Sequence, residues 1–202
     1  MINPRSNCVW DICCDHGYLG IASSKLFNKV ILLDSIESII SNIPTDIPRV
    51  EILKQDATNF NFKNKYSKNT FVLAGIGDDL TVKILKNLIP ILKENDEIIL
   101  NCHKNITLLR QFLIDKNFKL LEERLVEDKS QFYELIKVDM QSTTKISQYG
   151  EHFWSENIDI SRRYLENRIR YAKNRVNFQL KAKEDLNNYL AIAHNLSLSL
   201  KI

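Results

Sequence analysis

Short apolar runs alternate with amphipathic segments over most of the chain. The apolar runs predict strands at residues 9–12, 29–33, 50–53, 70–74 and 97–100. Between them, apolar positions three or four residues apart predict helices at residues 18–27, 35–41, 79–92 and 106–116. Strands and helices in regular alternation predict a parallel sheet with helices on both faces.

The alternation ends in two consecutive strands. Residues 120–126 and 131–138 have strand patterns, and the polar segment 127–130 between them suits a hairpin. We therefore expect an α/β domain over residues 1–140, with a Rossmann-like, doubly wound sheet that ends in an antiparallel hairpin. Ligands of such sheets bind beyond the carboxyl ends of the parallel strands.

The remaining sequence predicts helices only. Residues 141–157 lack a periodic pattern and are interpreted as a linker, and residues 158–202 as a small C-terminal α-helical domain. Residues 186–196 are expected to fold back as the second arm of a coiled-coil hairpin. The apolar stripe of the first arm consists of Leu165, Ile169, Ala172, Val176 and Leu180.

Positive charge is concentrated in this helical part. The net charge of the chain is only +3, but residues 140–202 hold ten basic and six acidic residues, a balance of +4. Such a stretch indicates an anionic partner, although a solvated charged face is the alternative. The side chains expected on one face, where they would contact phosphates, are Arg162, Arg163, Arg170, Lys173 and Lys181.

Three aromatic residues recur every seven positions in the same helix. Tyr164, Tyr171 and Phe178 would lie together on a further face. Rings in this arrangement can stack on nucleic-acid bases. We favour the alternative, a second packing seam against the returning arm.

Composition excludes several classes of protein. The four cysteines lack metal-ligand spacing, so we expect reduced thiols and no metal site. No apolar run approaches the roughly 20 residues of a membrane-spanning helix, and the first residues do not resemble a signal peptide. We therefore expect a cytoplasmic, monomeric protein without a membrane partner.

Four of the five glycines fall in two loops that each follow a predicted strand. Gly17 and Gly20 come after the first strand, and Gly75 and Gly77 after the fourth. Glycine permits a ligand to approach the backbone closely, and the first loop also opens a helix. Two such loops at the ends of neighbouring strands predict a cofactor cleft.

Aspartates occupy the same edge of the predicted sheet. Asp11 precedes the first glycine loop, Asp34 ends the second strand, and Asp56 follows the third. A carboxylate after the second strand can accept hydrogen bonds from ribose hydroxyls. Asp15 within the first loop would repel a pyrophosphate, which argues against a dehydrogenase. A nucleoside with a cationic sulfonium and an ammonium group fits this acidic loop better than a pyrophosphate does.

Two sequence strings resemble a known family. Asp11-Ile-Cys-Cys-Asp-His-Gly-Tyr-Leu19 resembles the Asp-Ile-Gly-x-Asp-His-Ala/Gly-Tyr-Leu motif of bacterial tRNA (adenine-22-N1)-methyltransferases. Val72-Leu-Ala-Gly-Ile-Gly77 resembles their Ile-Ala-Gly-Met-Gly loop, and the segment Arg110 to Val138 resembles their closing hairpin. The resemblance covers residues 8–139, and the helical tail matches the position of their coiled-coil domain.

The resemblance implies a class I methyltransferase that uses S-adenosylmethionine to methylate N1 of an adenine, at position 22 of tRNA. By the same resemblance, the cofactor site would be lined by Asp11, Asp15, His16, Gly17, Tyr18, Leu19, Asp34, Asp56, Ala57, Ala74, Gly75 and Gly77.

The loop after the fourth strand lacks the Asn/Asp-Pro-Pro-Tyr motif of enzymes that methylate exocyclic amines, which fits attack by a ring nitrogen. Adenine N1 needs no general base at neutral pH. Methylation leaves a cationic adenine, however, and Asp15 is our candidate catalytic residue for stabilising that charge.

The sequence also departs from the family. Cys13 replaces the first motif glycine, Asp78 follows Gly77 where a small residue is usual, and only about seven residues precede the first strand, where members carry a helix. Two alternatives therefore remain: a degenerate protein that binds S-adenosylmethionine or tRNA without activity, and a methyltransferase for a small molecule or protein. Cys102 and His103 are expected only in the wall of the pocket.

Overall fold

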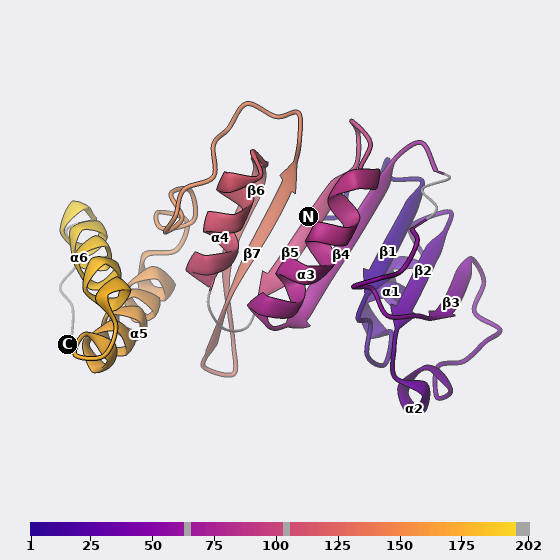
Figure 1. Cartoon of the computed structure of the whole chain (residues 1–202), viewed down its shortest axis with the longest axis horizontal. Coiled ribbons are helices and arrows are strands. Elements are labelled where there is room, and N and C mark those ends of the chain that lie inside the picture. The colour runs from indigo at the N-terminus through magenta and orange to yellow at the C-terminus, as the bar shows by residue number, and fades with distance from the viewer. Residues whose placement is uncertain (63–65, 103–105, 197–202) are drawn as a thin grey trace. The chain divides into compact units, whose positions relative to one another are not determined.

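The computed structural model describes residues 1–62, 66–102 and 106–196 (Figure 1). His103 lies outside these ranges. The strands are β1 (Cys8–Ile12), β2 (Val30–Asp34), β3 (Val50–Lys54), β4 (Asn69–Ile76), β5 (Glu97–Cys102), β6 (Lys119–Asp128) and β7 (Gln131–Asp139). The helices are α1 (Tyr18–Ser23), α2 (Glu37–Ile40), α3 (Asp78–Leu88), the 3-10 helix η1 (Ile89–Ile91), α4 (Ile106–Asp115), α5 (Ile158–Arg175) and α6 (Leu180–Asn195).

The strands form one sheet in the order β3-β2-β1-β4-β5-β7-β6. β1 pairs in parallel with β2 and β4, and β4 pairs in parallel with β5. β7 then runs antiparallel to β5. The predicted fold class, a doubly wound sheet that ends antiparallel and is followed by helices, is confirmed.

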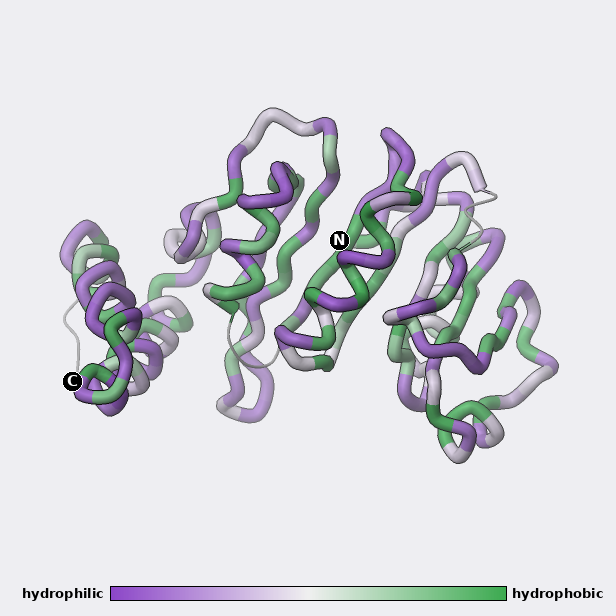
Figure 2. Tube along the Cα trace, in the orientation of Figure 1, coloured by the Kyte–Doolittle hydropathy of each residue, from purple (hydrophilic) through white to green (hydrophobic). Residues whose placement is uncertain are grey.

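Both faces of the central strands are buried, because successive side chains of a strand point to opposite sides. Trp10 and Ile12 of β1 belong to a large apolar cluster that also holds Leu85 of α3 and Leu109 of α4. Val9 belongs to a second cluster, to which α1 and α2 contribute. This two-sided burial explains why the central strands are largely apolar along their length (Figure 2).

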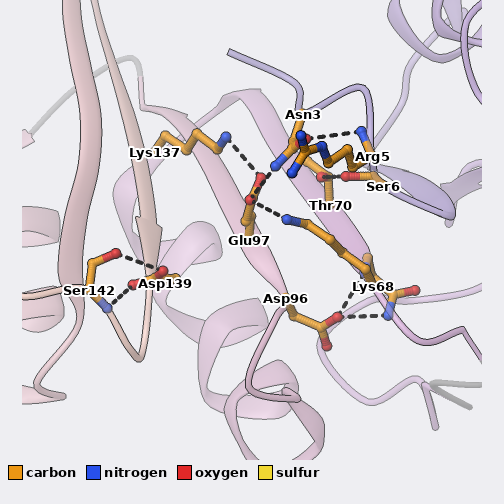
Figure 3. A network of polar contacts seen from close by, with 11 residues as sticks. Asn3, Arg5, Ser6, Lys68, Thr70, Asp96, Glu97, Lys137, Asp139 and Ser142 are labelled. Carbon is orange, nitrogen blue, oxygen red and sulfur yellow. Dashed lines mark hydrogen bonds and ion pairs between the residues drawn. The ribbon is translucent and has the colours of Figure 1, made fainter.

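A buried carboxylate at the amino end of β5 fixes the first residues of the chain. Glu97 accepts a hydrogen bond from Asn3 at 2.9 Å and pairs with Lys68 and Lys137, each at 2.8 Å (Figure 3). Burial alone would raise the pKa of Glu97, but hydrogen bonds from these three residues outweigh it and lower the pKa. The segment before β1 is thereby tied to the strands beside it.

The chain divides into two compact units. One comprises residues 1–122 and 135–146, and the other residues 123–134 and 147–202. The predicted boundaries, a domain at 1–140 and a linker at 141–157, differ from this division. Phe153 and Trp154, within the predicted linker, are buried in the core of the second unit against Leu165 and Tyr189.

The second unit contains a helical hairpin that begins at the predicted residue, Ile158, but turns earlier than its apolar spacing predicts. α5 ends at Arg175, and α6 begins at Leu180. Leu165, Ile169 and Ala172 of the predicted stripe are buried, but Leu180 is 94% exposed. No helix in the described part of the chain combines the length and apolarity needed to span a bilayer.

The prediction that Tyr164, Tyr171 and Phe178 form a packing seam is wrong for two of the three residues. Tyr164 is buried against Trp154 and Phe132, at ring distances of 5.7 and 5.4 Å. Tyr171 is 51% exposed and Phe178 is 85% exposed. The helix ends before Phe178, so the heptad spacing no longer determines where its ring points.

Candidate active site at the carboxyl edge of the sheet

The loop between β1 and α1 has an unusual backbone. Cys13, Asp15 and Gly17 all have positive φ, at 57°, 49° and 71°. Left-handed backbone costs a non-glycine residue roughly 1–2 kcal/mol, and such conformations gather at functional sites. The N–H groups of Cys13 and Cys14 both donate to the carbonyl of Leu33, at 2.8 and 3.2 Å, which clamps the loop onto the end of β2.

Asp34 joins two loops at this edge. Its Oδ2 accepts from the N–H of Asp15 at 3.2 Å, and its Oδ1 accepts from the N–H of Ile36 at 3.0 Å. Each carboxylate oxygen has a second lone pair, so Asp34 can still accept bonds from a ligand. The residue whose position at the end of the second strand assigns it to the ribose is therefore held rigidly in place.

Asp11 lies beneath the same loop. It is buried, and its Oδ2 accepts from the N–H of Gly20 in α1 at 2.8 Å. The close approach of α1 depends on Gly20, because a Cβ there would lie 2.2 Å from Cδ2 of Leu32. Asp11 thus positions the helix that follows the loop, and its direct contact with a ligand stays a prediction.

The negative charges of three aspartates all influence the thiol of Cys13. Burial, together with the negative charges of Asp34, Asp56 and Asp11, raises the pKa of the Cys13 thiol to about 11. The potential at Cys13 is therefore negative. A cationic ligand is favoured at such a place and a phosphate is disfavoured.

The second glycine loop has open space beside it. Gly75 has φ 78° at an irregularity in the pairing of β4 with β5, between Ala74 and Ile76. A Cβ on Gly77 would meet nothing within 4 Å. The backbone here is accessible to a ligand, and a cofactor cleft between the two glycine loops stays a prediction.

Residues 1–136 match the family model described as Methyltransferase domain, which is more than half of the chain. The chain belongs to the methyltransferase domain family. No curated protein matches its sequence.

Solved structures agree with the fold of this methyltransferase. M. capricolum TrmK in complex with S-adenosyl-homocysteine is 18% identical, with a TM-score of 0.74 over 98% of this chain and 93% of that one. The B. subtilis M1A22 tRNA methyltransferase TrmK is 14% identical, with a TM-score of 0.70 over 96% and 92%. The ribosomal protein L11 methylase of Lactobacillus delbrueckii subsp. bulgaricus is 14% identical, with a TM-score of 0.54 over only 68% and 72%.

Among the other predicted site residues of the methyltransferase, His16, Tyr18 and Leu19 are exposed at the start of α1. Asp56 is also exposed, and hydrogen bonds from the N–H and hydroxyl of Thr58 lower its pKa.

Ala57 is different, because its side chain is buried in the core. The whole residue is 4% exposed, so its contact with a ligand stays a prediction.

Sequence reasoning missed a residue that shapes the third loop. The carboxamide of Asn87 in α3 donates to the carbonyls of Ala57 at 3.1 Å and Phe60 at 2.8 Å. It thereby fixes the backbone after β3. Because the partners are about thirty positions apart, no local pattern signals the contact.

A cavity of about 260 Å³ lies elsewhere in the first unit. It is lined by Trp10, Ile31, Glu51, Leu53, Phe60, Asn61 and Tyr66. None of the predicted site residues borders it, and its aromatic walls belong to the side of the sheet that packs against α3 and α4. It is therefore separate from the edge described above.

The basic residues of α5 differ in how they are engaged. Arg162 pairs with Asp159, and Arg163 pairs with Glu127. The remaining predicted side chains, at positions 170, 173 and 181, are exposed, and none forms a salt bridge within the described part of the chain.

The buried carboxyl of Asp11 makes the stability of the methyltransferase depend on pH. Burial, with a further contribution from the charge of Asp34, raises its pKa to about 6 although the hydrogen bond from Gly20 opposes the rise. The folded pKa exceeds the unfolded value, so the native state holds this proton more tightly. The stabilisation that the protonated Asp11 provides is therefore complete below about pH 4. It is lost as the pH rises through about 6, by roughly 3 kcal/mol at 1.4 kcal/mol per pKa unit.

We expect Asp11→Asn to be more stable than the wild type at about pH 7.5, by about 2 kcal/mol, because the amide keeps an acceptor for Gly20 without a buried charge. The difference should shrink toward zero near about pH 4. Urea unfolding at the two pH values measures it. A difference that does not change with pH would contradict the raised pKa.

Proposed function

We propose that this methyltransferase uses S-adenosylmethionine to methylate N1 of an adenine in tRNA, at position 22, in the cytoplasm. The observation that carries the proposal is the extent of the structural match. The family model ends at residue 136, whereas TrmK aligns over 98% of the chain. The L11 methylase aligns over 68%, so the agreement with TrmK extends beyond the common methyltransferase fold.

The carboxyl edge supports the choice of cofactor. S-adenosylmethionine combines an adenosine with a sulfonium and an ammonium group, and it supplies an electrophilic methyl group when bound. The negative potential at Cys13 favours its positive charges. Asp34 has lone pairs left for ribose hydroxyls, and the space beside Gly77 admits a ligand close to the backbone. M. capricolum TrmK was solved with S-adenosyl-homocysteine, the demethylated product.

The chain's own task in catalysis is positioning. Adenine N1 has an available lone pair at neutral pH, so no side chain has to remove a proton from it. N1 also lies on the Watson–Crick edge, so the target base must be unpaired or flipped out. Rate enhancement then comes from orientation and electrostatics.

Asp15 is placed for the electrostatic part of this task. Its backbone N–H is held by Asp34, while its side chain is 69% exposed at the edge. A carboxylate there can stabilise the positive charge that develops on the methylated adenine. His16, whose Nε2 lies 3.8 Å from Oδ1 of Asp15, can orient that carboxylate.

Phosphate contacts with tRNA are assigned to Arg162, Arg163, Arg170, Lys173 and Lys181. The ion pairs of Arg162 and Arg163 must open or be shared, so the larger contribution should come from the other three. Affinity for tRNA should fall steeply with salt, since each phosphate contact releases counterions.

The test is incubation of the protein with S-adenosylmethionine and unmodified tRNA, followed by mass spectrometry of the digested nucleosides. The proposal predicts 1-methyladenosine, and a tRNA with guanine at position 22 should gain none. Methylation of another nucleoside would contradict the assigned target. Absence of any methylated nucleoside, with cofactor binding intact, would favour a degenerate binding protein.

A further inference from the structure

The turn between α5 and α6 exposes two large apolar side chains that the hairpin does not use. Phe178 is 85% exposed and Leu180 is 94% exposed, the two highest values among the large hydrophobic residues of the described chain. A side chain that packs against neighbours would be buried, so neither contributes to the core of the second unit. Two large apolar side chains exposed two positions apart mark a candidate interaction site, to be judged with their surroundings.

The turn itself is well defined. The N–H groups of Phe178 and Gln179 both donate to the carbonyl of Arg175, at 2.9 and 3.0 Å. The N–H of Ala182 then donates to the carbonyl of Gln179 at 3.0 Å as α6 begins. These bonds hold the backbone of Phe178 in place, so its ring is presented from an ordered position.

The surroundings of the ring are strongly positive. Between Glu166 and Glu184 there are six basic residues and no acidic one. Arg175 and Lys181 each lie three positions from Phe178, and Arg175 also covers the ring of Tyr171 at 4.8 Å. Lys181 and Lys183 stand in the first turn of α6, where the helix dipole disfavours cations. A polyanion beside them would offset this repulsion.

An exposed aromatic ring among cations is the combination that binds unpaired nucleotides. The base stacks on the ring, and the flanking phosphates pair with the basic side chains. We propose that the α5–α6 turn takes an unpaired nucleotide of the RNA substrate, with its base stacked on Phe178. This inference rests on the proposed function, because that function supplies the RNA. The inference adds that the protein recognises a loop or bulge of the RNA, where unpaired bases are available for stacking.

Charge complementarity favours RNA over other occupants. A second copy of the turn would bring six further basic residues against the first set, and like charges repel. An anionic membrane would also attract the lysines, and insertion of Phe178 and Leu180 into lipid is the competing explanation. The two explanations differ in the ligand they require, because stacking needs RNA with unpaired bases and insertion needs a lipid surface.

The experiment compares Phe178→Leu and Phe178→Trp with the wild type in equilibrium binding to unmodified tRNA. We expect Phe178→Leu to weaken binding about 5- to 150-fold, the range for loss of one stacked base, while Phe178→Trp retains affinity. Leu26→Ala, which trims an exposed apolar residue of the first unit, is the matched control and should bind normally. Lys181→Ala should weaken binding and reduce the slope of log affinity against log salt by about one.

Methyl transfer at saturating tRNA separates this inference from the proposed function. We expect Phe178→Leu to need a higher tRNA concentration than the wild type to reach saturation, that is, to have a higher KM for tRNA. If the wild type methylates tRNA and Phe178→Leu binds it equally well, the stacking role is overturned while the proposed function stands. If the wild type neither binds nor methylates tRNA, both fail. Binding of the wild type to phosphatidylserine vesicles, with unchanged tRNA affinity in Phe178→Leu, would assign the turn to membranes instead.

Discussion

Gly20→Ala is expected to destabilise the protein by about 3 kcal/mol, at the upper end of the cost of overpacking. The added Cβ would lie 2.2 Å from Cδ2 of Leu32 and 3.0 Å from Oδ2 of Asp11. Leu32 is fully buried, so it cannot give way. The start of α1 must therefore move off the sheet and lose the hydrogen bond between Gly20 and Asp11. In an unobstructed helix the same change would be stabilising, so the sign of the effect is informative.

Thermal unfolding measures this effect, which corresponds to roughly a 10 °C lower Tm for a chain of this size. Gly77→Ala is the matched control, because its Cβ would enter open space. We expect the control to keep the wild-type Tm but to bind S-adenosylmethionine more weakly, since the methyl group would project toward the proposed ligand. Equal Tm values for the two variants would show that α1 does not approach the sheet as closely as described.

Asp34→Asn is expected to weaken the binding of S-adenosylmethionine about 30- to 100-fold, or roughly 2–3 kcal/mol, the cost of losing hydrogen bonds to a charged acceptor. The carboxylate already accepts from Asp15 and Ile36, and the proposed ribose hydroxyls need its remaining lone pairs. An amide nitrogen accepts no hydrogen bond, so one loop contact or one ligand contact must be lost.

Titration calorimetry gives the two dissociation constants. Glu37→Gln provides a matched change of a carboxylate to an amide, because Glu37 is exposed three positions further on, and its one ion pair among the described residues is with Lys54 at the surface. We expect this control to bind the cofactor normally. An Asp34→Asn protein with wild-type affinity would remove Asp34 from the binding site.

The sequence predicts the edge of the sheet well because parallel strands bring their ends together. Apolar runs locate β1, β2 and β4, and every residue that directly follows them is thereby placed at one edge. Gly17, Asp34 and Gly77 could be assigned to this edge without a structure. These residues lie near one another because parallel strands end at the same edge of the sheet. No local sequence pattern encodes their proximity.

Contacts between distant segments could not be predicted in the same way. The hydrogen bond from the N–H of Gly20 gives Asp11, an aspartate expected to bind a ligand, the additional role of positioning α1. Phe153 and Trp154 look like part of a polar linker because two aromatic residues are too few to form a period. Their burial depends on helices that come later in the chain.

The end of α5 illustrates a further limit. Val176 and Leu180 continue the apolar spacing, and neither glycine nor proline interrupts residues 170–182. The pattern therefore predicts one long helix, whereas the chain turns after Arg175 and leaves Phe178 outside the helices. Periodicity reports which side chains would share a face if the helix continued, but tertiary packing determines whether it does.

The central claim is that the carboxyl edge of the sheet binds a cationic sulfur nucleoside. A crystal structure of the protein grown with millimolar S-adenosylmethionine tests it most directly. The account predicts the nucleoside between the loop at residues 13–17 and the loop at residues 75–77, with its ribose hydroxyls on Asp34. A nucleoside bound beside Trp10 and Phe60 instead, or an edge that remains empty at that concentration, would contradict the claim.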